Sequence, residues 1–172
     1  MDGQICRGSF FGGGEIGHQV IQIQDGLPCG CGRKGCWEQY ASATALIRFG
    51  KEAAENNPDS LLNKMAKDDD INPKIIFDCA KAGDAVAAEV LEDYFKYVAC
   101  GVANLINIIE PDMIVLGGGI SAQKEYLSDA VKKYVQDEMY GGHALKTKIK
   151  TATLGNDAGI IGAAFLGKSI DI

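Results

Sequence analysis

The sequence predicts an α/β protein in which helices pack on a partly parallel sheet. Three observations lead to this prediction. Residues 1–36 are rich in glycine and in short β-type runs, the rest of the chain alternates between helical and strand patterns, and the order there is helix, strand, helix, strand, helix. The 172 residues, 47% hydrophobic and 23% charged, are enough for one core of ordinary size, so a single domain is expected.

Short-range signals place the elements of the first half. Residues 19–24 read Q-V-I-Q-I-Q, and this alternation of polar and apolar side chains predicts a half-buried strand. From Trp37 the pattern becomes helical, with Ser42 as a candidate N-cap, and Asn72 before a proline is typical of a second helix start. Asp84 is the candidate N-cap of a long helix through Ile109, whose apolar residues at mixed spacings of three and four predict that it is largely buried.

The second half holds two further expected strands. Residues 111–119 read P-D-M-I-V-L-G-G-G, a short apolar run ending in glycines, which predicts a buried strand in a sheet covered on both faces. Residues 148–154 alternate as a strand, and Asn156-Asp157 can cap a final helix rich in small residues. The expected helices span residues 42–56, 72–83, 84–109, 122–139 and 156–167.

Charge and hydropathy exclude two classes of partner. The net charge is -6 and the sequence pI is about 4.9, so the chain has no positive field to attract nucleic acid or anionic lipid directly. The first eleven residues hold no sustained apolar segment of the signal-peptide kind, and the other apolar runs are far shorter than a membrane span. The sequence therefore predicts a cytoplasmic protein, where a reducing medium favours metal binding or buried thiols over disulfides.

Four potential metal ligands lie in one nineteen-residue window. His18, Cys29, Cys31 and Cys36 read H-x10-C-x-C-x4-C. Three reduced thiols beside a surface histidine are the alternative, but clusters at such tight spacing usually bind metal, and tetrahedral zinc requires four such ligands. Because all four positions are protein side chains, the site is predicted to be closed and structural. Glycines that let the loop turn sharply stand at positions 26, 30, 32 and 35.

Three further cysteines lie outside this cluster. Cys79 and Cys100 fall on helix faces that the pattern predicts to be buried, so they are read as small core residues. Cys6 has no such context.

The residues around the cluster resemble the signature of a known family. Gly14–His18 read G-E-I-G-H, Pro28–Glu38 read P-C-G-C-G-R-K-G-C-W-E, and Ala41-Ser42 follow. The combination is similar to the ROK family, which groups bacterial glucokinases and other sugar kinases with sugar-responsive repressors. The similarity continues through residues 82–84, 111–119 and 154–164, and so covers essentially the whole chain.

The resemblance implies an actin-like, ribonuclease-H-like ATPase fold of two lobes, with sugar and nucleotide in the cleft between them. This chain, residues 1–172, matches only the C-terminal lobe, the one that carries sugar and zinc. In the family, an N-terminal lobe supplies a phosphate loop and a general-base aspartate, and neither motif is found here. Asn156-Asp157 has the letters of the base motif but aligns with the family's C-terminal segment, so no catalytic residue is expected in this chain.

The resemblance also implies the binding residues. Glu15, His18 and Glu38 are expected to contact sugar hydroxyls, with one ring nitrogen of His18 on zinc and the other on the sugar. The alternative for both glutamates is a solvated surface position. Three glycines after the strand resemble the family's adenosine-side contact, although any tight turn after a strand uses glycine: Gly117, Gly118 and Gly119.

The function implied is ATP-dependent phosphorylation of a hexose, as in glucokinase, with magnesium accompanying ATP. This chain would supply sugar binding, structural zinc and part of the nucleotide pocket, in a protein that forms a homodimer. The alternative is the sugar-sensing domain of a ROK-type transcriptional repressor, which binds a sugar without phosphorylating it. The residues quoted are shared by kinases for several hexoses, so they do not select one sugar.

Overall fold

The computed structural model describes residues 5–66 and 70–168, and the longest element in this part is helix α5, Ala85–Ile109. Its N-terminus is capped by Asp84, whose carboxylate accepts a hydrogen bond of 2.7 Å from the backbone N–H of Ala87. Eleven of its residues are buried, and it forms the centre of the core. The predicted start, end and burial of this helix are confirmed.

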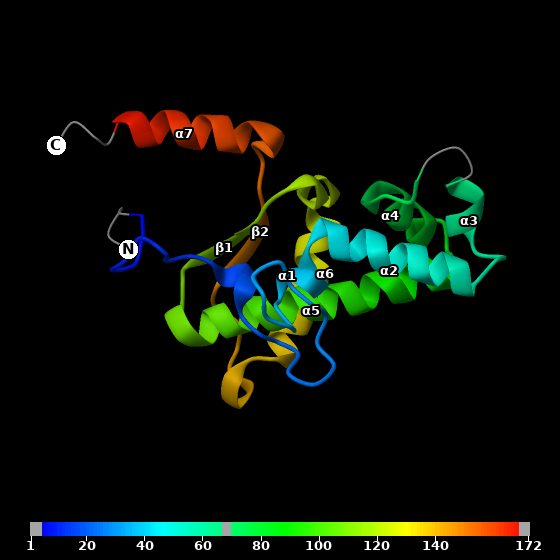
Figure 1. Cartoon of the computed structure of the whole chain (residues 1–172), viewed down its shortest axis with the longest axis horizontal. Coiled ribbons are helices and arrows are strands. Elements are labelled where there is room, and N and C mark those ends of the chain that lie inside the picture. Colours follow the sequence, from blue (N-terminus) through cyan, green and yellow to red (C-terminus); the bar gives the residue numbers. More distant parts are fainter. Residues whose placement is uncertain (1–4, 67–69, 169–172) are drawn as a thin grey trace.

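Three helices of nine or more residues pack against α5 (Figure 1). They are α2 (Ala43–Asn56), α4 (Pro73–Lys81) and α6 (Glu125–Asp137). Ser42 and Asn72 cap α2 and α4 as predicted, because the side chain of each accepts a bond of 3.1 Å from a backbone N–H three residues ahead.

The short helix α1 (Glu38–Ala41) lies where the sequence is predicted to become helical, from Trp37 on, but it is separate from α2, and the short helix α3 (Leu61–Met65) is not predicted by the sequence pattern. With four and five residues, neither is long enough to display a helical period. The helix expected to begin at residue 122 instead begins at Glu125, because a 3₁₀ turn, Gly119–Gln123, intervenes. It ends at Asp137, two residues before the expected position.

The sheet consists of strands β1 (Met113–Leu116) and β2 (Lys148–Thr151), paired in parallel from Met113↔Lys148 to Leu116↔Thr151. Helix α6 connects them along the chain, which confirms the parallel β-α-β arrangement. The prediction that the first strand is covered on both faces is wrong: Met113 and Val115 are 44% and 55% exposed. Ile114 and Leu116 pack on the core, so the described residues cover one face only.

The strand expected at residues 19–24 is also not formed. Val20 makes an isolated antiparallel bridge with Cys36, the backbone N–H of Ile21 donates to the carbonyl of Gly35, and Ile23 is 90% exposed. A strand needs a neighbour along its length, and within the described part of the chain the backbone bonds of this segment reach only as far as the short stretch Gly35–Trp37.

The C-terminal helix α7 (Ala158–Lys168) lies apart from the helices that carry the core (Figure 1). It begins after a 3₁₀ turn, Gly155–Asp157, and β2 ends at Thr151 before the expected residue 154. Its sequence, A-G-I-I-G-A-A-F-L-G-K, is apolar on all sides, yet Ile160 is 74% exposed. Among the helices that the structure describes, none is long and apolar enough to cross a membrane.

Candidate functional site

The cysteine loop is folded by its own backbone and by two glycines. The N–H of Cys29 donates to the carbonyl of Arg33 at 2.9 Å, and the N–H of Gly32 returns to the carbonyl of Cys29 at 3.0 Å. Gly32 and Gly35 have φ of 86° and 77°, so the sequence prediction of left-handed glycines is confirmed at these two positions. A Cβ at Gly35 would also lie 1.8 Å from the carbonyl oxygen of Gln22, which excludes every other residue.

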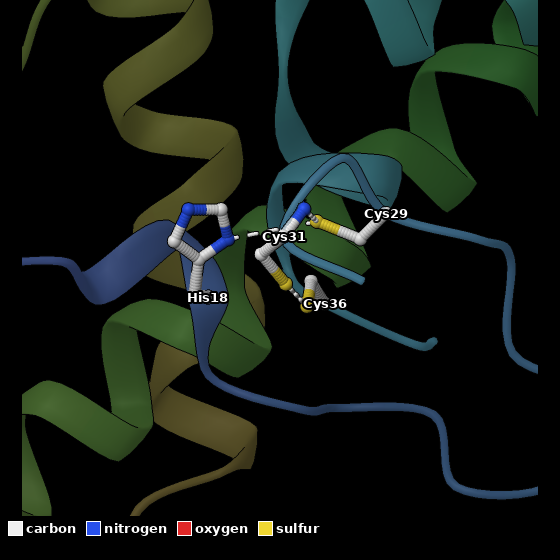
Figure 2. A group of neighbouring side chains, drawn as sticks. All are labelled: His18, Cys29, Cys31 and Cys36. Carbon is white, nitrogen blue, oxygen red and sulfur yellow. Dashed lines mark hydrogen bonds between the residues drawn. The ribbon is translucent and has the colours of Figure 1, made fainter. Parts of the chain in front are cut away.

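The four predicted metal ligands come together. Their ligand atoms all lie within 4.8 Å of one another, and Figure 2 shows the four side chains turned toward a common point. Cys31 Sγ is 3.6 Å from Cys36 Sγ, and Cys29 Sγ is 3.6 Å from His18 Nδ1. Tetrahedral zinc with Zn–S of about 2.3 Å and Zn–N of about 2.0 Å places such pairs about 3.6–3.8 Å apart. The donor set and its spacing therefore fit zinc.

Two hydrogen bonds give the thiols opposite acidities. Cys29 donates to the Glu38 carboxylate at 2.9 Å, and this bond is the largest of the causes that raise the pKa of Cys29 to about 12. The backbone N–H of Arg33 donates to Cys31 and lowers the pKa of that thiol to about 6, with the Cys29 thiol and the Arg33 guanidinium adding to the effect. A metal ion takes thiolates as ligands, so a metal bound at Cys29 would remove the bond from this thiol to Glu38 and release that carboxylate.

His18 stands between the cysteines and a second carboxylate. It ends the 3₁₀ turn Ile16–His18, with Nδ1 facing Cys29 and Nε2 3.9 Å from Glu15 Oε2. Glu38 Oε1 lies 3.7 Å from Nδ1, and the bond from Cys29 is the main cause that holds the pKa of Glu38 below its usual value. The structure thus gathers the three predicted sugar-contacting residues around one imidazole. Sequence reasoning did not foresee the contact between Glu38 and Cys29.

The three predicted glycines follow β1 directly. Gly118 has φ of 80° and accepts a bond of 2.7 Å from the Ser121 hydroxyl, and Gly119 begins a 3₁₀ turn. Gly118 and Gly119 line a cavity of about 650 Å³ that also touches Thr151 just across the strand pair. The carboxyl ends of parallel strands are where open α/β sheets bind ligands. Sequence reasoning missed the rest of this lining, Lys124, Thr153 and Gly155 among it, because the cavity forms where two segments that are distant along the chain, 118–125 and 151–155, meet.

A smaller cavity of about 230 Å³ connects the two sets of residues. Gly117, Gly118 and Gly119 line one side of it, and Trp37, the residue between Cys36 and Glu38, lines another. The metal loop and the glycine turn are therefore neighbours in space, although about eighty residues separate them in sequence.

The remaining cysteines lie away from this site. Cys79 is fully buried and Cys100 is partly buried, in agreement with their prediction as core residues, and burial raises the pKa of both thiols. Cys6 is exposed.

Fold and site together define an α/β chain with a Cys₃His loop beside a glycine turn at the ends of two parallel strands. The model of the ROK family matches residues 1–170, and the chain belongs to this family. It is 35% identical to a glucokinase from Streptomyces coelicolor over an alignment of 173 residues. This alignment covers 98% of the present chain and 54% of that glucokinase.

Two further relatives show the range of the family. A crystal structure of a ROK family glucokinase from Streptomyces griseus in complex with glucose and AMPPNP matches with a TM-score of 0.88 and 34% identity, over 96% of this chain and 55% of that one. A xylose repressor from Caldicellulosiruptor bescii is 28% identical over 162 residues, which are 94% of this chain and 40% of that protein. The chain thus spans about half the length of the curated glucokinase it matches.

Proposed function

We propose that the intact protein is an ATP-dependent hexose kinase of the glucokinase type, and that this chain is its sugar-binding, zinc-carrying C-terminal lobe. The observation that carries the proposal is the position of His18, whose Nδ1 faces Cys29 while its Nε2 faces Glu15. One imidazole can therefore serve the metal cluster and a carboxylate that binds sugar. The glucokinase relatives support a sugar kinase, and the S. griseus enzyme holds glucose and an ATP analogue.

In this proposal three side chains orient the hexose. Glu15 and Glu38 accept hydrogen bonds from sugar hydroxyls, since carboxylates are strong acceptors. His18 donates from Nε2, because coordination at Nδ1 fixes the hydrogen on the other nitrogen. Zinc, held by His18, Cys29, Cys31 and Cys36, supplies structure only: four protein ligands leave no position for an activated water.

The nucleotide is assigned to the cavities at the glycine turn. At the ends of the strands the backbone carries no side chains at Gly117, Gly118 and Gly119, and the adenosine side of ATP would bind there. Mg²⁺ would accompany the phosphates of ATP. The position of Trp37 in the smaller of these cavities supports a sugar site and a nucleotide site that share one cleft.

The rest of the catalytic apparatus is assigned to a lobe that precedes this chain in the intact protein. That lobe would supply the general-base aspartate and the phosphate loop, and it would cover the apolar surface of α7. Coverage of only half of the glucokinase relatives supports this division. We place the protein in the cytoplasm as a homodimer, with no direct contact between this chain and nucleic acid.

Activity assays of two forms test the proposal. The intact protein should turn over ATP in the presence of glucose in a coupled assay, whereas the 172-residue chain alone should not, because positioning without a proton acceptor forfeits much of the rate. Hexose-dependent turnover by the isolated chain would overturn the assignment of lobes.

Metal analysis tests the site independently of activity. Purified chain should contain one zinc per molecule, and removal by a chelator should expose residues 26–38 to proteolysis, since metal binding and loop folding are coupled. Protein without zinc that keeps a protease-resistant loop would argue against this assignment.

Glu38→Gln tests the sugar site. The substitution preserves shape but replaces a charged acceptor by an amide, so we expect about a ten-fold loss of hexose affinity in the intact kinase, with little change in stability. Isothermal titration measures the affinity, and Glu55→Gln, an exposed change on α2, is the charge-matched control. Equal affinity in Glu38→Gln and wild type would remove this residue from the sugar site, and loss of zinc would reassign it as a support of the metal loop.

The second candidate is the sugar-sensing domain of a ROK-type repressor, which the similarity to a xylose repressor favours. Sugar binding by the intact protein without ATP turnover, together with sugar-dependent DNA binding through a preceding segment, would support this candidate over the kinase.

A further inference from the structure

Arg33 lies inside the metal loop without being one of its ligands. Its guanidinium donates from Nη2 to the backbone carbonyl of His18, fifteen residues earlier in the chain. Its own carbonyl accepts the N–H of Cys29, so its backbone is held by the turn that carries the thiols. One residue therefore connects the loop with three ligands to the turn with the fourth.

The net charge of the zinc-loaded site would be negative, so a cation near it would be stabilising. Zinc with three thiolates and a neutral imidazole carries one net negative charge, and the carboxylate of Glu38 adds another nearby. The thiols of Cys29, Cys31 and Cys36 raise the pKa of the Arg33 guanidinium, with Cys31 as the largest cause, so the cation interacts favourably with the cluster. Arginine can supply this charge and bond the His18 carbonyl together, because its planar guanidinium carries several donors in fixed directions, whereas lysine offers a single flexible ammonium.

We propose that Arg33 is a positioning residue that holds the His18 turn against the thiol loop and balances the charge of the metal-bound thiolates. Both the affinity for zinc and the affinity for hexose then depend on it, and the hexose part rests on the proposed function. Partners of this kind around a metal site typically change its affinity by about 10–100-fold when they are mutated.

The first experiment measures zinc affinity of the 172-residue chain by competition with a chromophoric chelator. Arg33→Gln should bind zinc at least about ten-fold more weakly than wild type, and Arg33→Lys, which keeps the charge but not the fork, should lie between them. Lys34→Gln removes the same charge one residue along and should leave the affinity near wild type. Equal losses in Arg33→Gln and Lys34→Gln, or no loss in either, would overturn the proposal.

The second experiment separates positioning from metal retention. Glucose is titrated into the intact protein at saturating zinc, with the absorption of the cobalt-substituted form as a check that the four-ligand site is occupied. Arg33→Gln should still bind glucose more weakly, and KM should rise while kcat changes little, because ground-state orientation is lost. Wild-type affinity in fully loaded Arg33→Gln would refute the positioning role. A wild type that binds no glucose would instead refute the proposed function, with the zinc result unaffected.

Discussion

A methyl group added to Gly101 should disturb the cysteine loop from the helix that packs against it. Gly101 lies in α5 against the indole of Trp37, and a Cβ there would lie 2.0 Å from Cε2, 2.4 Å from Cδ2 and 2.5 Å from Cζ2. The ring cannot simply withdraw, because its Nε1 donates to the carbonyl of Tyr97 at 2.7 Å. Since Trp37 lies between Cys36 and Glu38, its displacement must also move the loop.

Two effects oppose each other in Gly101→Ala. Alanine favours the helix by about 1 kcal/mol over glycine. Overpacking a filled site costs about 1–3 kcal/mol, and the loss of the indole hydrogen bond adds about 1 kcal/mol. Three ring atoms lie far inside contact distance, so the clash belongs at the upper end, and the net loss should be about 3 kcal/mol. For a chain of this length the melting temperature should fall by about 6–12 °C.

Urea unfolding and tryptophan emission measure both consequences. Trp37 is the only tryptophan in the sequence, so a red shift of its emission in the folded variant reports its displacement directly. Gly162→Ala in α7 is the control, because nothing lies within 4 Å of a Cβ there and only helix propensity acts. If Gly101→Ala is at least as stable as wild type and keeps its emission, the tight contact between α5 and Trp37 is refuted.

Two other predictions concern the ends of helix α5. Glu110 ends α5 in a left-handed conformation (φ 47°, ψ 60°), which asparagine adopts more readily than glutamate. Glu110→Asn should therefore raise the free energy of unfolding, measured by urea titration, by about 0.5–1 kcal/mol. The control Glu138→Asn, at the right-handed end of α6, should give no such gain. At the other end, burial opposes ionisation of Asp84, but the backbone N–H groups of Ala87 and Leu61 outweigh it and hold the pKa of that carboxyl below its usual value. Asp84 therefore stabilises the fold above about pH 4 and loses this contribution as pH falls through its folded pKa, so the melting temperature of Asp84→Asn should fall less steeply in acid; equal slopes would refute this.

Features set by near neighbours in the chain were predictable. The four candidate metal ligands lie within nineteen residues, so their spacing alone indicated that they would come together, and the caps at Ser42, Asn72 and Asp84 act on amides three residues ahead. The proposed sugar contacts Glu15 and Glu38 flank the same loop, and their role rests on the resemblance. Local chemistry thus sufficed for most of the helices and for the cluster.

Features that depend on distant partners were not predictable. The alternation at residues 19–24 indicates which side chains a strand would bury. It does not show whether another segment lies beside these residues to pair with them, and a strand forms only with such a partner. The contact of Trp37 with Gly101 joins residues that are 64 positions apart. The sequence around Gly101 indicates only a residue of low helix propensity and gives no sign that an indole ring packs against it. The same holds for the cavity between the ends of β1 and β2.

Helix α7 should give the chain two separate opening reactions. Isolated helices shorter than about 12–15 residues are marginal in water, and α7 has 11 residues that lie apart from the core. The amide hydrogens of α7 should therefore exchange with solvent through local fraying, whereas those of α5 should exchange only through global unfolding. If the proposed preceding lobe docks on α7, the amide exchange of α7 should slow without a matching change in the exchange of α5. Amide exchange in these two helices would then report docking and folding as distinct free energies within one molecule.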